Sequence, residues 1–286
     1  MNLSRKTTML FSLAVCGMLL PAAARAADGT FDKTLHVSGQ VMLSVNTGSG
    51  YIHVSPGSGS EVHIIGHVHA NGWGFGASAD DRVHQVVANP PIEQSGNIIT
   101  VGKHNEWLHN VSIDYDITTP RGTDLEANSG SGDLRLQDVG GSLKANTGSG
   151  SIQANGVTGR VSLETGSGDI NADMTASSDV RAQTGSGGIH LQGVDGTLYA
   201  ETGSGDIEVG GHPGANWKLQ TGSGSVTLNV GNSHFTLDAS TGSGDVHSDP
   251  PFTIHGSLNR HHVQGDINGG GPTVRVETGS GDIRIH

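Results

Sequence analysis

The chain has 286 residues, of which 46 are glycine, eleven are aromatic and one is cysteine, and its formal net charge is −12. Glycine has no every-third spacing, which excludes collagen, and the large side chains are too few for one thick globular core. Beyond residue 26, no apolar run approaches the ~18 residues that a membrane-spanning helix needs. The acidic balance, without any basic stripe, argues against nucleic acid and anionic lipid as partners.

Residues 1–26 have the three parts of a secretory signal peptide. A basic pair at residues 5–6 precedes an apolar run over residues 7–20, and Ala24-Arg25-Ala26 fits the small-x-small cleavage pattern. We therefore expect cleavage after Ala26 and export to the periplasm, the outer surface or the extracellular space of a bacterium. The alternative, a lipoprotein cysteine at Cys16, is disfavoured because the bulky Val15 stands where a small residue is needed.

Export changes the composition of the mature chain. Residues 27–286 contain no cysteine, so no disulfide can form in a compartment where disulfides persist. Loss of three basic residues lowers Lys+Arg from 15 to 12 against 27 acids, which gives a formal net charge of −15. The stability of the mature chain must then come from backbone pairing and packing.

Residues 27–124 form an irregular N-terminal β region that we expect to cap the rest. The strand-like runs in it are Leu35–Val37, Val41–Val45, Tyr51–Val54, Val62–Ile65, Ile98–Val101 and Val111–Ile117. A glycine-rich loop carries Trp73 and Phe75, which would either fold over an open end as a cap, the interpretation we favour, or form a binding tip. Trp107, among His104, Glu106 and His109, is open to the same two interpretations.

Histidine occurs 16 times, and one group of three is a candidate metal site. His63, His67 and His69 share one parity if their strand is continuous, although Gly66 would interrupt it. We expect these side chains to face solvent without metal, because a convergent ligand set with a second shell is not evident. The sequence predicts no catalytic, cofactor-binding or metal-binding residue and no cofactor.

Residues 125–286 form a regular repeat built on the tetrapeptide Thr-Gly-Ser-Gly. Its copies there begin at Ser129 (with Ser for Thr), Thr147, Thr165, Thr184, Thr202, Thr221, Thr241 and Thr278, and one earlier copy begins at Thr47. Successive copies from 129 to 241 lie 18–20 residues apart, and the last gap of 37 residues is taken as two repeats, with a degenerate copy at Gly265-Asp266-Ile267. Apolar residues stand four and two positions before each copy and five and seven positions after it, except for Ser248. This period of two is typical of half-buried strands.

Each repeat therefore consists of a strand, a glycine arc, a second strand and a turn. A unit of about 18 residues with two short strands cannot bury enough surface to fold alone, so neighbouring units must stack. The predicted fold is an all-β, single-stranded β-solenoid, similar to a parallel β-helix, with two-strand coils of ~18–20 residues at ~4.8 Å per coil. We interpret the tetrapeptide as a corner that needs glycine for φ > 0, and not as a phosphate loop or a nucleophile elbow.

Two polar rows accompany the arcs. After each arc stand Asp133, Ser151, Asp169, Gly188, Asp206, Ser225, Asp245, Asp266 and Asp282. Before each arc stand Glu164, Gln183, Glu201, Gln220 and Ser240. Except at Asp266, acids alternate with neutral residues, which doubles the separation of like charges, so we interpret both rows as solvated faces that limit self-repulsion. A calcium ladder is the alternative, although the calcium-binding nonapeptide is missing.

The segment Val111-Ser-Ile-Asp-Tyr-Asp-Ile117, then Pro120-Arg-Gly-Thr123 and the repeated Thr-Gly-Ser-Gly-Asp-Ile units resemble a bacterial family of adhesin-like proteins with β-strand repeats. The resemblance covers about residues 35–286. It implies a secreted or envelope-associated solenoid without established function, and it supplies no catalytic residues to carry over. The adhesin label itself rests on analogy between folds.

These features lead to a non-enzymatic binding or scaffold protein whose partner is a glycan or another envelope protein. A polysaccharide-acting enzyme is the alternative, with Asp206 as a residue to test, but the acids lie in rows and not in one cleft. Ice binding fits poorly, because only one threonine row is present. Self-assembly is a further alternative, since the chain ends on the strand Asp282-Ile-Arg-Ile-His286, which we expect to be an open edge that self-associates.

Overall fold

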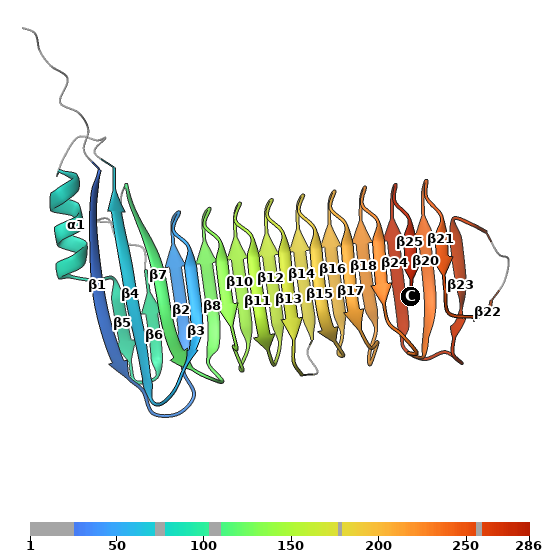
Figure 1. Cartoon of the computed structure of the whole chain (residues 1–286), viewed down its shortest axis with the longest axis horizontal. Coiled ribbons are helices and arrows are strands. Elements are labelled where there is room, and N and C mark those ends of the chain that lie inside the picture. The colour runs from blue at the N-terminus through green and yellow to red at the C-terminus, as the bar shows by residue number, and fades with distance from the viewer. Residues whose placement is uncertain (1–25, 72–77, 103–109, 177–178, 256–258) are drawn as a thin grey trace, which may run out of the picture.

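The computed structural model describes residues 26–71, 78–102, 110–176, 179–255 and 259–286. Its strands stack into two long sheets, A and B, that run along a rod (Figure 1) and enclose one continuous core. The predicted all-β solenoid is confirmed. Most of the expected signal peptide, Trp73, Phe75 and the segment around Trp107 lie outside the described residues.

Sheet A has twelve strands in the described residues. In spatial order they are β1 (Ala27–His36), β4 (Glu61–Ala70), β7 (Val111–Pro120), β3 (Ile52–Gly57), β9 (Leu134–Gln137), β11 (Ile152–Val157), β13 (Ile170–Met174), β15 (Ile189–Val194), β17 (Ile207–Gly211), β19 (Val226–Asn229), β25 (Ile283–Ile285) and β21 (Val246–Ser248).

Sheet B has thirteen strands in the same part of the chain. In spatial order they are β22 (Phe252–Ile254), β23 (His262–Ile267), β20 (Phe235–Thr241), β24 (Thr273–Thr278), β18 (Trp217–Thr221), β16 (Leu198–Thr202), β14 (Val180–Thr184), β12 (Val161–Thr165), β10 (Leu143–Thr147), β8 (Asp124–Ser129), β2 (Met42–Thr47), β6 (Ile98–Val101) and β5 (Ile92–Ser95).

Each regular coil places one strand in sheet B and the next in sheet A, joined by a Thr-Gly-Ser-Gly arc. Equivalent residues stack in register; Leu143 pairs with Leu125 on one side and with Val161 on the other. The apolar residues of the period-two pattern point into the core; Leu163 and Ile170, for example, are fully buried. The period of two in the sequence is therefore the alternation between core and solvent.

The threonine of each arc is buried and connects two coils. In the arc between β12 and β13, Thr165 Oγ1 donates to the Gly150 carbonyl of the preceding coil at 2.8 Å. The same oxygen accepts from the Gly168 N–H at 3.2 Å. Because each hydroxyl is both donor and acceptor, it satisfies two backbone groups at a corner that the core would otherwise leave unpaired.

The expected reason for the glycines is wrong. None of the arc glycines among the described residues has a positive φ. A Cβ on Gly166 would instead lie 2.3 Å from the Gly148 oxygen, and a Cβ on Gly168 would lie 2.0 Å from the Gly150 oxygen. The arcs need glycine because neighbouring coils approach too closely for any side chain, and not because of a left-handed backbone.

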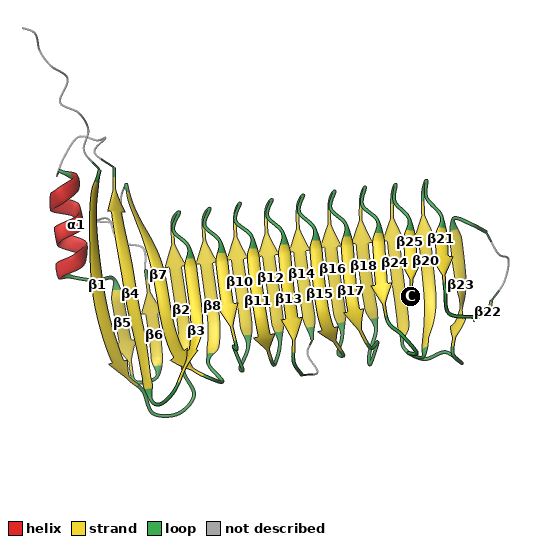
Figure 2. Ribbon diagram, in the orientation of Figure 1, coloured by secondary structure: helices red, strands yellow, loops and turns green. Residues whose placement is uncertain are grey.

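The N-terminal end differs from the regular coils. Strands β1, β4 and β7 pair antiparallel, whereas β2 and β3 already stack in parallel on β8 and β9. Figure 2 shows helix α1 (Ala79–Ala88), which the sequence did not predict, beside β1 at the end of the rod. A capping box joins Ser78 and Asp81, and Val83 and Val86 of α1 are buried. The division at residue 124 stays a prediction.

The C-terminal end corrects two expectations. Residues 265–267 are not a degenerate coil, because they belong to β23, which pairs antiparallel with β20 and β22. The last strand is not an open edge, because β25 pairs in parallel with β19 on one side and with β21 on the other. The chain therefore returns to insert its last coil between two earlier ones. An unpaired edge at β25 therefore cannot be the basis of the predicted self-association.

Candidate binding face

The outer surface of sheet B from β2 to β20 is a continuous polar surface that the repeats create. We call it the ladder face. Every second residue of these strands points outward, so equivalent positions of successive coils form straight rows. The central row consists of Ser44, Glu126, Lys144, Ser162, Arg181, Tyr199, Lys218, Arg275 and Asp238. The arc-side row consists of Asn46, Asn128, Asn146, Glu164, Gln183, Glu201, Gln220, Glu277 and Ser240.

The arc-side row is a hydrogen-bonded ladder of amides and carboxylates. Asn146 Nδ2 donates to Asn128 Oδ1 at 2.8 Å. Further along, Gln183 Nε2 donates to Glu201 at 2.8 Å, and Gln220 Nε2 donates to Glu277 at 2.5 Å. The predicted alternation of acid and amide is thus present, and Gln183 and Gln220 each also bind one neighbouring carboxylate. The row carries donors and acceptors in fixed positions along the rod.

The centre of the ladder face holds one aromatic ring between two cations. The Arg181 guanidinium carbon lies 4.5 Å from the centroid of the Tyr199 ring, and Lys218 Nζ lies 5.7 Å from it. These distances are those of cation–π contacts. Tyr199 donates its hydroxyl to Glu201 at 2.6 Å. That hydrogen bond, followed by burial, raises the pKa of Tyr199.

Three carboxyl groups of the ladder face have lowered pKa values. Hydrogen bonds from Tyr199 and Gln183 lower the pKa of Glu201. The hydrogen bond from Lys144, at 2.9 Å, lowers the pKa of Glu126. Burial alone would raise the pKa of Asp238, but hydrogen bonds from Arg275 and His262 outweigh it and the pKa is lowered. None of these groups is poised to donate a proton near neutral pH.

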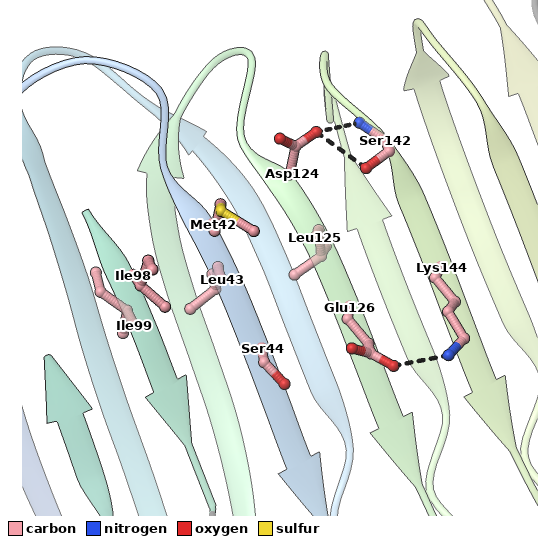
Figure 3. A pocket seen from close by; sticks show the side chains of 10 residues that line it. All are labelled: Met42, Leu43, Ser44, Ile98, Ile99, Asp124, Leu125, Glu126, Ser142 and Lys144. Carbon is pink, nitrogen blue, oxygen red and sulfur yellow. Dashed lines mark hydrogen bonds and ion pairs between the residues drawn. The ribbon is translucent and has the colours of Figure 1, made fainter. Parts of the chain in front are cut away.

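A shallow apolar pocket of about 290 Å³ opens at the N-terminal end of the ladder face (Figure 3). Met42 and Ile98 pair across β2 and β6 and are about half exposed. Leu43 and Ile99 also line the pocket, and the Glu126–Lys144 pair stands at its side. Exposed large apolar side chains are otherwise rare in the described residues, where Ile254 is the third.

The three candidate histidines lie on the opposite sheet, on the outer face of β4, and do not converge. His63 contacts Asp32 at 2.7 Å, and His69 contacts Asp28 at 2.7 Å. His67 reaches Asp116 at 3.4 Å. Each has its own carboxylate, and the described residues contain no group of three or more His, Cys, Asp or Glu suited to a metal ion.

Asp116 lies at the centre of this histidine surface. It also contacts His53 at 3.2 Å and accepts the Tyr51 hydroxyl at 2.9 Å. Burial, then the bond to Asp116, raises the pKa of Tyr51 to about 12. These contacts join β3, β4 and β7, which gives them a structural role in the antiparallel end.

The aspartates after the arcs also serve the backbone. Asp133 Oδ1 accepts the Ser151 N–H at 2.9 Å, and Asp169 Oδ1 accepts the Gly188 N–H at 2.8 Å. Asp206 Oδ1 accepts the Ser225 N–H at 2.7 Å. Each acid therefore binds a backbone group of the next coil, in addition to the charge spacing that the sequence suggested.

The sequence had selected only part of the ladder face. It identified the acids and amides of the arc-side row but not Arg181, Tyr199 and Lys218, because a period of two does not rank one outward position above another. Their signal is chemical: three large cationic or aromatic side chains at the same position of consecutive coils. Met42 and Ile98 were missed because both were taken as ordinary members of apolar runs.

The fold and face described above define a two-sheet β-solenoid with a polar ladder. The sequence matches the family described as Toastrack DUF4097 over residues 71–286. The chain belongs to this family. No curated protein matches the sequence. Among the described residues, no helix is long and apolar enough to cross a membrane.

Three solved structures are similar to the chain. One is named a "putative adhesin" from Bacteroides fragilis, with 13% identity and a TM-score of 0.46, covering 90% of this chain and 97% of that one. A "putative cell adhesion protein" from Clostridium sporogenes has 13% identity and a TM-score of 0.24, covering 90% and 99%. A "putative lipid binding protein" from Parabacteroides distasonis has 14% identity and a TM-score of 0.42, covering 90% and 96%.

Proposed function

We propose that the protein is an exported, non-enzymatic binding or scaffold protein that holds an extended polysaccharide of the cell envelope along its ladder face. The observation that carries the proposal is the regular row of amides and carboxylates beside Tyr199 and its two cations. Export is supported by the leader at residues 1–26. The proposal assigns the protein to the periplasm or the cell surface.

A polysaccharide suits this surface because its hydroxyl groups both donate and accept hydrogen bonds. The ladder offers carboxylates that only accept, amides that do both, and cations that only donate. The positions recur at ~4.8 Å per coil, so acid and amide positions recur at about twice that spacing. A linear polymer with its own repeat can form many weak contacts in parallel, and their sum gives affinity without a deep pocket.

Two further features of the face fit such a ligand. Arg181 and Lys218 contact the Tyr199 ring, and within the described part of the chain neither has a carboxylate at ion-pair distance. Their polar hydrogens are therefore available to a ligand. The pocket beside Met42 and Ile98 offers an apolar patch to the less polar side of a sugar ring.

A hydrolytic or lyase activity is less well supported. Glycoside hydrolysis needs a carboxylic acid of raised pKa and a second carboxylate across one cleft. Among the described carboxyl groups with a shifted pKa, every shift is a lowering. Most acids of the ladder face, namely Glu126, Glu201, Asp238 and Glu277, also bind neighbouring amides, hydroxyls or cations. They are arranged to be acceptors and not proton donors.

The test is co-sedimentation of the purified protein with a panel of insoluble envelope polysaccharides, with polymer length measured on the same samples. We expect saturable binding and unchanged polymer length. Shortened polymer would overturn the non-enzymatic assignment. Binding to envelope protein but to no polysaccharide would replace the proposed ligand class.

A matched pair of variants locates the binding face. Arg181→Gln with Lys218→Gln removes two cations from the ladder face. Arg135→Gln with Arg284→Gln removes two exposed cations from sheet A. Losing two charge-assisted contacts should weaken binding about tenfold, which corresponds to about 1.4 kcal/mol, and the sheet A variant should bind like the wild type. Equal effects of the two variants would rule out the ladder face.

A further inference from the structure

The order of coils at the C-terminal end does not follow the sequence. In sheet B, β24 lies between β18 and β20, and in sheet A, β25 lies between β19 and β21. The slot between residues 217–229 and residues 235–248 is thus filled by residues 273–285. Figure 1 shows the same arrangement, with the C-terminus inside the rod and not at its end.

The inserted coil makes the full set of stacking contacts with both walls of the slot. Six residue pairs join β24 to β20 and five join it to β18. Thr278 Oγ1 donates to the Gly224 carbonyl at 2.8 Å, and Thr241 Oγ1 donates to the Gly281 carbonyl at 2.8 Å. Val274, Val276, Ile283 and Ile285 are fully buried. The coil is equivalent to any other coil of the solenoid.

Only one short turn connects this coil to the rest of the chain. Asn268, Gly269 and Gly270 in that turn all have positive φ, at 52°, 95° and 78°. Glycine adopts other backbone conformations without strain, so the turn can also open into an extended linker. No contact between the coil and its slot depends on which chain the coil comes from.

We infer that the C-terminal coil, residues 272–286, is exchangeable, and that its partner is a second copy of this chain. In the exchanged dimer the coil of each molecule fills the slot of the other. The stacking hydrogen bonds and apolar contacts between the coil and its slot are kept, so the two forms differ in the entropy of association and in the turn, where the hydrogen bond from Asn268 to the Ser233 carbonyl is lost. The inference concerns the end of the rod and does not depend on the ladder face.

An empty slot would bind the C-terminal coil of a second molecule. An empty slot leaves the edges of β18, β19, β20 and β21 without their partner strands and uncovers the apolar residues along them. Unpaired parallel edges and apolar surface drive pairing with any strand that fits their register. The coil of a second molecule fits by construction, and at high concentration it competes with the tethered coil of the same molecule.

Cysteine pairs across the slot test the inference. Ser240 and Glu277 are Cα partners between β20 and β24, and neighbouring parallel strands lie ~4.8 Å apart, within the range of a disulfide. One chain carries Ser240→Cys and another carries Glu277→Cys, both with Cys16→Ser. The two are unfolded, mixed, refolded at high concentration and oxidised. A covalent dimer forms in register only if coils are exchanged.

Asn146→Cys mixed with Glu164→Cys is the matched control, because these residues are partners in the same row of coils that are contiguous in sequence. We expect about tenfold more covalent dimer from the slot pair than from the control pair, an effective-concentration effect. Deleting Gly269 and Gly270 should raise the dimer fraction of the otherwise unchanged protein in light scattering. A chain carrying both Ser240→Cys and Glu277→Cys should close its disulfide within the monomer.

Equal crosslinking of the slot and control pairs, while the doubly substituted chain closes its own disulfide, would overturn the exchange. Failure of the doubly substituted chain to close would contradict the coil order itself. Both readouts are independent of polysaccharide binding, so they do not share an outcome with the test of the ladder face.

Discussion

Replacing one arc glycine by alanine separates two explanations of the repeated tetrapeptide. Gly166 and Gly48 occupy the same position of their arcs, and neither has a positive φ. A Cβ on Gly166 would lie 2.3 Å from the Gly148 oxygen, whereas a Cβ on Gly48 has no atom within 4 Å. Both sites lie in a Thr-Gly-Ser-Gly arc, and they differ in that only Gly166 has an arc of a preceding coil packed against it.

The two substitutions should therefore change the free energy of unfolding in opposite directions. Overpacking of this kind costs about 1–3 kcal/mol, while Gly→Ala at a compatible backbone gains about 0.4–1 kcal/mol by restricting the unfolded chain. Gly166→Ala should lose about 1–2 kcal/mol of unfolding free energy on balance, from these two terms. Gly48→Ala should raise the free energy of unfolding by about 0.4–1 kcal/mol, because its methyl group meets no neighbouring atom. The clash is with backbone atoms, so it cannot be relieved by a side-chain rotation.

Urea denaturation followed by circular dichroism measures both variants, with the midpoint compared at unchanged slope. Equal destabilisation of the two would refute the close-approach explanation and restore a conformational one. Crystal or solution evidence that Gly166→Ala widens the spacing of only the two adjoining coils would support it further.

Three other substitutions test the remaining interactions by the same denaturation assay. Thr165→Val should cost about 1–3 kcal/mol, because the Gly150 carbonyl and Gly168 N–H lose their buried partner, and Thr165→Ser should recover most of it. Trp217→Ala should cost about 3–5 kcal/mol, since Trp217 is buried and donates to the Gly196 carbonyl at 3.0 Å; a smaller loss would mean that the slot collapses around the cavity. Asp238→Asn should flatten the acid limb of the stability curve. The pKa of Asp238 is lowered in the folded state, so its contribution is present above the ordinary carboxyl range of about 4 and is lost as pH falls through the folded pKa; parallel curves for variant and wild type would contradict this.

The regular part of the fold was predictable because two periods coincide in it. The spacing of 18–20 residues gives the coil, and the period of two around each arc, as at Val161 and Leu163, gives the strands. Both follow from local geometry, so they can be identified without knowing which elements meet. The role of the arc glycines could not be derived in the same way, because their constraint comes from the adjoining coil and not from their own backbone.

The strands of the N-terminal end were predictable from the sequence, but its helix was not. Helix α1 is short and has only three buried residues, Ala79, Val83 and Val86, so its apolar periodicity is weak. Its start is readable in hindsight from Ser78 and Asp81, three residues apart in a capping box. On the candidate face, outward positions follow from the alternation, but which of them matter depends on cross-strand neighbours such as Arg181 beside Tyr199.

The order of the last coils shows where the polar rows contain information and where they mislead. In sequence order Gln220 would neighbour Ser240, and the alternation of amide and acid would end there. With β24 inserted, Gln220 donates to Glu277 and the alternation continues. The row of residues after the arcs would instead argue against the insertion, because the insertion places Asp282 directly beside Asp245. The Asp282 carboxylate accepts the Asp245 N–H at 3.1 Å, so backbone hydrogen bonding offsets the charge repulsion that alternation avoids elsewhere. A row of side-chain pairs thus indicates coil order only where the pairing is a hydrogen bond between side chains, as it is along the ladder face.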